Sequence, residues 1–303
     1  MSVPLSGGDT PVAGASAADA GPWRAAMRRL RRDRVAMIAL GVLAMFVVAA
    51  VFAPVVAPYA PNAQPDIVGL ARVAPSWSHP FGTDAFSRDV LSRVVYGARI
   101  SLGVATLAIL LAMSAGTAWG AVAGYAGGAT DAVMMRIIDA LLAVPRILIL
   151  LLVLGLWGNI SLPMLVLVLG LTGWFGTSRL VRERVRALSK QDFTLAARAM
   201  GAPDLRVLWR HVLPNALSPV IVAATLGIGN VIVLEAALSY LGIGVRPPHA
   251  SWGNIIEDGA DQIGSAWWIA LFPGLAMLVT VIAFNLLGDA LRDALDPRDE
   301  RRP

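Results

Sequence analysis

"TLAARAMGAPDLRVLWRHVLP", residues 194–214, lies between two hydrophobic stretches of the chain and is itself basic. Its first part consists largely of residues with high helix propensity. Gly201 follows where the end of a helix favours a left-handed residue, and Pro203 and Asp204 suit the first turn of a second helix. Pro214 is predicted to end the unit before the next hydrophobic stretch. The segment therefore predicts a compact helix–turn–helix.

The two sides of the second helix differ in polarity. Arg206 and Arg210 lie one turn apart on one face. Four apolar residues recur with helical spacing and predict a single apolar face: Leu205, Leu208, Trp209 and Val212. One interpretation is an elbow that lies on the membrane surface with its arginines on anionic lipid. The other is a knob that inserts into a groove on a partner protein, because the small residues Ala196, Ala197 and Ala199 would let another backbone approach closely.

The surrounding sequence has the composition of an integral membrane protein. The chain has 303 residues, of which 57% are hydrophobic and 15% are charged, whereas soluble domains carry about 25% charged residues. Its apolar residues cluster into runs of about the length that crosses a bilayer, and helices are the open-chain structures that satisfy their own backbone there. We therefore predict an all-α membrane protein with six transmembrane helices, at residues 35–57, 100–124, 137–157, 161–178, 215–242 and 267–288.

The chain divides into three parts on this basis. Residues 1–34 form an N-terminal tail, first rich in small residues and predicted to be disordered, then basic. Residues 35–290 form the six-span domain, with the loop 179–214 ahead of the fifth span. Residues 291–303 form a C-terminal tail. The first apolar run is longer than the core of a cleavable signal peptide and is taken as a retained span.

The basic residues are distributed as membrane topology requires. Six spans place both termini and the loop 179–214 on one side, which carries nineteen of the 25 basic residues, while the other side carries five. Because Lys and Arg accumulate in cytoplasmic loops, both termini are predicted to be cytoplasmic. The sequence pI near 10.4 is therefore attributed to topology, and no nucleic-acid partner is expected.

Several chemistries have no residues to carry them. The chain has no cysteine and three widely separated histidines, so we expect no metal site. Its one lysine, Lys190, is not part of the glycine-rich loop that holds nucleotide phosphates. The chain is thus predicted to hydrolyse no ATP, to bind no cofactor and to have no catalytic residues.

Two acids and one glycine stripe stand inside the predicted spans. Asp139 is expected near the inner end of the third span, either in an interfacial ion pair or in the transport pathway. Glu235 is expected near the outer end of the fifth span, where it would reach the surface or a partner, or line the passage. Glycines at steps of four in the second span predict a helix-packing face, against this chain or a homologous subunit: Gly116, Gly120 and Gly124.

The loop 179–214 resembles the EAA loop of importer-type ABC permeases. That pattern is E-A-A, three residues, G, nine residues, I, any residue and L-P, and five positions match at the right spacing: Ala196, Ala197, Gly201, Leu213 and Pro214. Leu195 stands where the family usually has Glu, and His211 where the pattern has Ile. The resemblance implies that this loop, with Arg206 and Arg210, couples the permease to an ATPase.

Three longer stretches narrow the resemblance to the C-type permease subunit of dipeptide, oligopeptide and nickel importers. They are residues 79–105, 197–215 and 235–256, which include "HPFGTDAFSRDVLSRVVYGAR" and "EAALSYLGIGVRPPHASWGNII". The resemblance implies a bacterial inner-membrane protein with four kinds of partner: a homologous second permease, two ATP-binding subunits that hold ATP and Mg²⁺, an extracytoplasmic substrate-binding protein and membrane lipid. Two other hypotheses remain, a self-sufficient ion-coupled secondary transporter and an anchoring protein without a passage.

Overall fold

The computed structural model describes residues 22–158 and 160–295. The tails predicted at residues 1–21 and 296–303 lie outside the described residues. Within the described ranges the regular structure is helical, apart from one isolated bridge between Thr83 and Asp89. The predicted all-α class is confirmed.

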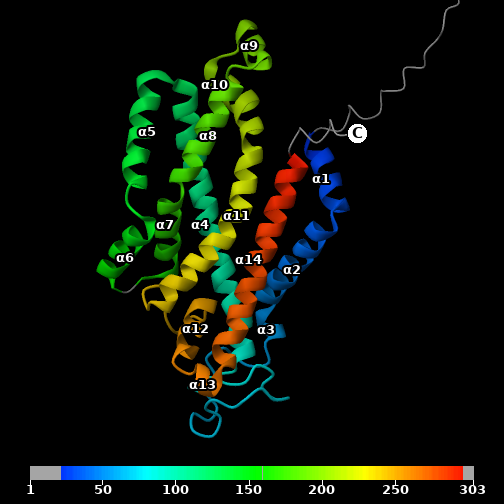
Figure 1. Cartoon of the computed structure of the whole chain (residues 1–303), viewed down its shortest axis with the longest axis vertical. Coiled ribbons are helices and arrows are strands. Elements are labelled where there is room, and N and C mark those ends of the chain that lie inside the picture. Colours follow the sequence, from blue (N-terminus) through cyan, green and yellow to red (C-terminus); the bar gives the residue numbers. More distant parts are fainter. Residues whose placement is uncertain (1–21, 159, 296–303) are drawn as a thin grey trace, which may run out of the picture.

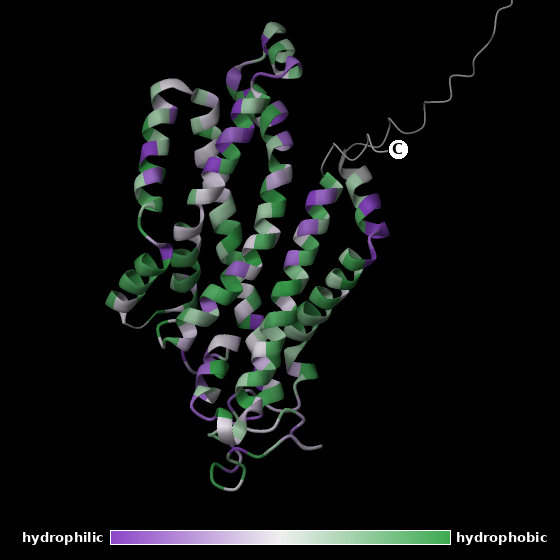
Figure 2. Ribbon diagram, in the orientation of Figure 1, coloured by the Kyte–Doolittle hydropathy of each residue, from purple (hydrophilic) through white to green (hydrophobic). Residues whose placement is uncertain are grey.

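The long helices run between two ends of the molecule (Figure 1). The first end carries α1, the C-terminal end of α14 and the segment from α9 to α10, and we call it the α9 end. The second, the α12 end, carries α12, α13 and the loop that follows α3. Figure 2 shows hydrophobic residues along most of the helix lengths and hydrophilic residues mainly toward the two ends. The helices are α1 (Pro22–Arg32), α2 (Arg34–Val51), α3 (Ala53–Val56), α4 (Val90–Ala126), α5 (Gly128–Leu142), α6 (Arg146–Trp157), α7 (Leu162–Gly173), α8 (Phe175–Leu188), α9 (Asp192–Ala199), α10 (Asp204–Val207), the π-helical turn η1 (Leu208–Val212), α11 (Leu213–Tyr240), α12 (Trp252–Ala260), α13 (Ile263–Ala266) and α14 (Trp268–Leu295).

Four described helices are each long and apolar enough to cross a membrane, and the number rises to six if each of two bent helix pairs is one span. The pair α5 and α6 is bent by 74°, and the pair α7 and α8 by 45°. Pro145 explains the first break, because proline disfavours a helical residue before it and lacks the N–H that continues a helix. Arg146 bridges this break to α7 by donating to the carbonyl oxygen of Leu169 at 2.7 Å. The second break, at Trp174, corrects the continuous span predicted for 161–178.

Helix α4 is longer than the predicted span 100–124. It has 37 residues and begins at Val90, which at about 1.5 Å per residue makes it about 55 Å long. Asp89 caps it, since its Oδ2 accepts a hydrogen bond of 2.7 Å from the backbone N–H of Ser92. The helix therefore starts well before the apolar run, because its first turns pack against protein instead of lipid.

The glycine stripe of α4 packs against α8 of the same chain. A Cβ atom added to Gly120 would lie 2.4 Å from the carbonyl oxygen of Ser178, and one added to Gly124 would lie 2.5 Å from that of Arg182. Gly116 meets Trp174 and Thr177 in the same way. The stripe is therefore an intrachain packing face, and the contact with a homologous subunit that the sequence left open is wrong for these glycines.

Candidate functional site

Residues 192–212 project beyond the helix bundle at the α9 end, and we call them the projecting segment (Figure 1). Helix α9 ends in a turn where Gly201 has φ +82°, as predicted for a left-handed glycine. The chain then enters α10 and η1 and continues without a break into α11, so residues 204–240 form one 37-residue helix. The prediction that Pro214 ends the unit is wrong. In the π turn, the N–H of Leu213 donates to the carbonyl oxygen of Leu208, and this i to i+5 pairing carries the helix past the proline.

The apolar residues of the second helix divide between two environments. Leu208 and Val212 are buried, together with Val207, in a cluster shared with α8 and α9. By contrast, Leu205 and Trp209 have relative exposures of 68% and 63%. The chain itself therefore covers only half of the apolar face predicted from their spacing, and the other half remains exposed.

The residues predicted for the coupling loop also divide by burial. Ala197 and Leu213 are buried in the chain's own core. Small size at Ala197 thus serves packing within this chain, which corrects the expectation that it admits a partner's backbone. The other five are exposed: Ala196, Gly201, Arg206, Arg210 and Pro214.

Four contacts that sequence inspection missed hold the projecting segment in place. The hydroxyl of Tyr125, at the end of α4, donates to Asp204 Oδ1 at 2.8 Å. The guanidinium of Arg198 lies 5.1 Å from the centre of the Tyr125 ring and 3.4 Å from Asp204 Oδ1. Thr194 Oγ1 donates to the carbonyl oxygen of Leu188 at 2.8 Å. Both helices of the segment are thus tied to each other and to the bundle.

Asp139 forms an ion pair with Arg179 of α8, and about half of each side chain is exposed. The ion-pair interpretation of Asp139 is therefore confirmed. Asp131 lies about two turns before Asp139 in α5. It pairs with Arg182, which also belongs to α8. Helices α5 and α8 are held together by two acid–arginine pairs near the α9 end.

Glu235 is fully buried, with a relative exposure of 0%. Its Oε2 accepts a hydrogen bond of 2.9 Å from Ser101 of α4, and its Oε1 accepts one of 2.7 Å from Ser239. These serines in turn accept the backbone N–H groups of Trp252 and Val245. The side chain does not reach the surface of the chain, so the prediction that it extends there is wrong, whereas a place in the transport passage stays a prediction. It joins α4, α11 and the start of α12.

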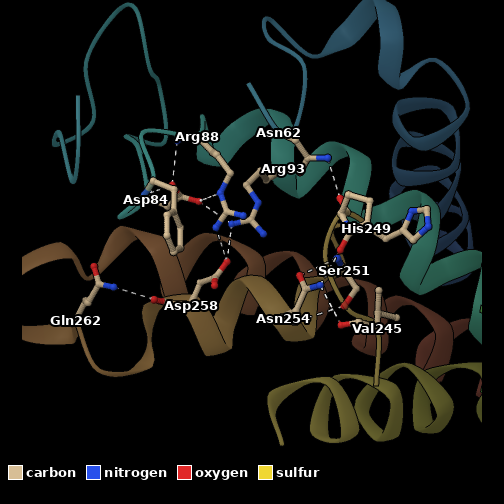
Figure 3. Close-up of polar contacts among 12 residues, drawn as sticks. Asn62, Asp84, Arg88, Arg93, Val245, His249, Ser251, Asn254, Asp258 and Gln262 are labelled. Carbon is tan, nitrogen blue, oxygen red and sulfur yellow. Dashed lines mark hydrogen bonds and ion pairs between the residues drawn. The ribbon is translucent and has the colours of Figure 1, made fainter. Parts of the chain in front are cut away.

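A second polar group, the arginine–aspartate cluster, lies at the α12 end (Figure 3). Two arginines, one just before α4 and one in its first turn, point toward two aspartates, one before α4 and one in α12. Arg93 Nη1 donates to Asp84 Oδ2 at 2.7 Å and to Asp258 Oδ2 at 2.6 Å. Arg88 donates to the same two oxygens at 2.6 and 2.9 Å. Because Asp84 and both arginines are buried, this cluster fixes the loop before α4 onto α12.

The cluster joins the first sequence motif, residues 79–105, to α12, whose first residues belong to the second motif, residues 235–256. A separate buried pair lies in the same loop, where His79 Nδ1 is 2.9 Å from Asp89 Oδ1. Asn254 and Ser251 cap α12 reciprocally. Sequence inspection assigned these stretches to a family but missed their contact, because the pairing residues are 165 or more positions apart.

Two cavities open in the described part of the chain. One of about 440 Å³ lies at the α12 end, between the turn 160–163 and residues 246–249. The other, of about 730 Å³, lies at the α9 end among α8, α11 and α14. No group of three or more His, Cys, Asp or Glu side chains with metal-binding geometry occurs within residues 22–158 and 160–295.

The sequence matches known membrane transport components. A family model described as binding-protein-dependent transport system inner membrane component matches residues 116–300, and one described as the N-terminal TM domain of oligopeptide transport permease C matches residues 21–75. The chain belongs to the family of binding-protein-dependent transport system inner membrane components. It is a multi-pass inner-membrane permease subunit.

The relatives within this family are C-type peptide permeases. The chain is 40% identical over 280 residues to the dipeptide transport system permease protein DppC of Alkalihalophilus pseudofirmus, covering 91% of this chain and 90% of the relative. It is 38% identical over 276 residues to the oligopeptide transport system permease protein OppC of Bacillus subtilis, covering 91% and 90%. A putative peptide transport system permease protein of Brucella abortus is 43% identical over 277 residues, covering 89% and 90%. The resemblance stated from the motifs is confirmed.

Proposed function

We propose that this chain is one permease subunit of an ATP-driven importer of dipeptides or oligopeptides. The family supports a permease in a binding-protein-dependent system, and the relatives named above are described as peptide permeases. The chain would form the passage with a second, homologous permease. A substrate-binding protein would deliver peptide at the α12 end, and two ATPase subunits would bind ATP and Mg²⁺ at the α9 end.

The distribution of charge supports the orientation. Helix α1, the C-terminal end of α14, the projecting segment and most of the basic residues belong to the α9 end, and the positive-inside rule supports a cytoplasmic position for that end.

The projecting segment is the observation that carries the proposal. Its tip exposes large apolar side chains, with Met200 at 83% in addition to Leu205 and Trp209, and Arg206 and Arg210 flank them. Exposed apolar groups rimmed by charge are typical of protein interaction sites. A groove on an ATPase subunit would cover them.

Transport requires that this contact differ between the nucleotide states of the ATPase. A partner shifts a conformational equilibrium only by its difference in affinity for the two conformations. Because the segment continues into α11 and is tied to α4 by Tyr125, a displacement of its tip would move two membrane helices directly.

Site-directed crosslinking tests this docking. The chain has no cysteine, so Ala199→Cys or Arg206→Cys introduces one thiol in the projecting segment. In the complex with its companion subunits, we expect crosslinks to an ATPase subunit whose yield changes with ATP. Met27→Cys, exposed on α1, is the matched control and should give none. Repeated failure to capture an ATPase subunit from the segment would exclude the proposed coupling.

The alternative is an ion-coupled secondary transporter, and the positions of Glu235 and Asp139 argue against it. Glu235 is enclosed by serine hydroxyls and Asp139 is an exposed ion pair, so neither is placed as a proton relay. Uptake by this chain alone in liposomes, driven by an ion gradient and independent of ATP, would favour the alternative.

A further inference from the structure

The cavity at the α9 end is polar and has no acidic residue in its lining. Its volume of about 730 Å³ lies within the usual range of small-ligand pockets. Apolar residues of α8, α11 and α14 form much of the wall, and the polar lining consists of Arg184, Gln191, Asn215, Ser218 and Arg292. Two cations with hydrogen-bonding neighbours suit an anionic ligand.

Arg184 differs from the other arginines of α8. Arg179, Arg182 and Arg186 lie within 4 Å of the acids of α5. Arg184 is two residues from Arg182, about 200° around the helix, and it lines the cavity instead. Neither Arg184 nor Arg292 has an ion pair with any residue in the described part of the chain. Both cations are therefore available to a ligand.

The sides of α11 and α14 that line the cavity also carry polar residues farther from the α9 end. Asn230 lies on the same helical face as Asn215 and Leu226, and it is exposed. Asn285 of α14 is exposed as well, and its Oδ1 would lie 3.7 Å from a Cβ added to Gly229 of α11. Polar side chains are costly in hydrocarbon and usually face protein or a water-filled space. This side of α11 and α14 thus has the polarity of a passage wall.

A close helix contact separates the cavity from these amides. A Cβ added to Gly288 would lie 2.5 Å from Leu226 Cδ2, so α11 and α14 touch at the inner limit of the cavity. The cavity lies on the α9 side of this contact, with Leu226 in its lining.

We propose that the cavity is the cytoplasmic vestibule of the peptide passage, in which Arg184 and Arg292 bind the α-carboxylate of the transported peptide. Asn215 and Ser218 hydrogen-bond the peptide backbone. Arginine suits this role because its guanidinium matches a carboxylate with two parallel hydrogen bonds. The inference rests on the proposed importer function and adds a binding site within this chain.

Thiol labelling tests the site without requiring transport. In the cysteine-free chain, assembled with its companion subunits, Ser218→Cys should react with a water-soluble maleimide from the α9 side. A dipeptide with a free carboxylate should slow this reaction several-fold, and the same dipeptide with a C-terminal amide should not. Equal protection by both peptides, or no reaction with the maleimide, overturns the proposal.

Uptake by the reconstituted complex tests the arginines. The measured quantity is the ratio of free-acid to amidated dipeptide uptake at saturating binding protein. We expect Arg184→Gln with Arg292→Gln to lower this ratio about tenfold, since the variant loses the charge-assisted hydrogen bonds that distinguish a carboxylate from an amide. The double Lys variant should keep much of the ratio, and Arg136→Gln, exposed on α5 outside the cavity, should leave it unchanged.

The remaining outcomes separate this site from its alternatives. An equal loss of uptake for both peptides in the Gln variant means that the arginines are structural and overturns the proposal. If protection of Ser218→Cys follows the phosphatidylglycerol content of the vesicles instead of the peptide, the arginines bind lipid headgroups and the proposal fails. Absence of ATP-dependent uptake by the unaltered complex refutes the importer function itself. The thiol-labelling experiment still tests separately whether the peptide binds in this cavity.

Discussion

At the scale of single residues, Gly201 and Glu235 show how function and stability separate in this chain. Gly201 lies in an exposed turn, and a Cβ there would meet no atom within 4 Å. Its requirement is conformational, because φ is +82°. Glu235 is the opposite case, a charged side chain whose environment is built entirely from neighbouring hydroxyls and helices.

Replacement of Gly201 should therefore affect coupling more than folding. A left-handed conformation costs most residues about 1–2 kcal/mol, and β-branched residues tolerate it poorly. We expect Gly201→Val to shift the turn and lower ATP-driven uptake about tenfold, with normal amounts of protein in the membrane. Gly201→Asn is the matched variant, since asparagine accepts this conformation, and it should transport almost normally. Wild-type uptake by Gly201→Val would contradict the role of the turn.

Replacement of Glu235 should affect stability more than transport. Glu235→Leu removes the acceptor of Ser101 and Ser239, and an unsatisfied buried polar group costs about 1–3 kcal/mol. We expect a clear fall in the thermal unfolding temperature of the detergent-solubilised protein. Glu235→Gln keeps one acceptor oxygen and should lose less. A Gln variant of unchanged stability that no longer transports would show that the carboxylate itself has a functional role.

At the scale of helices, close approach of α4 and α8 organises the half of the bundle near the α9 end. The glycines of α4 permit it, and the carbonyl oxygens of Ser178 and Arg182 occupy the space that side chains would need. Because α8 leads directly into α9, this packing also supports the base of the projecting segment.

The glycine contact predicts a position-dependent effect of one methyl group. Gly120→Ala would place Cβ 2.4 Å from a backbone oxygen, and overpacking of this kind costs about 1–3 kcal/mol. We expect a lower unfolding temperature and less folded protein. Gly103→Ala in the same helix meets nothing within 4 Å and should be neutral or slightly stabilising, because alanine favours helices. Equal effects of the two substitutions would contradict the packing account.

The order of the membrane helices could largely be predicted from the apolar runs, but the bends within these helices could not. Composition predicts the crossings, and Pro145 marks one bend. Trp174 carries no such signal, so the bend there depends on tertiary packing. Periodicity grouped Leu205 and Trp209 with Leu208 and Val212, yet a pattern within one helix does not say where the rest of the chain lies. The arginine–aspartate cluster was missed for a similar reason, since Arg93 and Asp258 are far apart in sequence.

At the scale of the whole molecule, the two ends have different surfaces. The α9 end carries the projecting segment and the termini of the bundle, and the α12 end carries the loop before α4 with the fully exposed Trp77. The predicted six-span arrangement would put these ends on opposite sides of the membrane.

Labelling from each side checks this topology. Met200→Cys should react with an impermeant thiol reagent in inside-out vesicles and not in intact spheroplasts, because the positive-inside rule places the α9 end in the cytoplasm. Trp77→Cys should show the reverse. The unaltered chain has no thiol and serves as the blank. Reaction of both variants from one side would refute the six-span arrangement.

Helix α4 connects the two ends as a single rod. It contacts the projecting segment through Tyr125 at one end and Asp258 through Arg93 at the other, and no proline interrupts its 37 residues. If a straight helix about 55 Å long tilts by about ten degrees around its midpoint, each end moves by about 5 Å, and the two ends move in opposite directions. A displacement of α4 at the α9 end would therefore move its other end in the opposite direction, and no rearrangement of side chains between the two ends is needed.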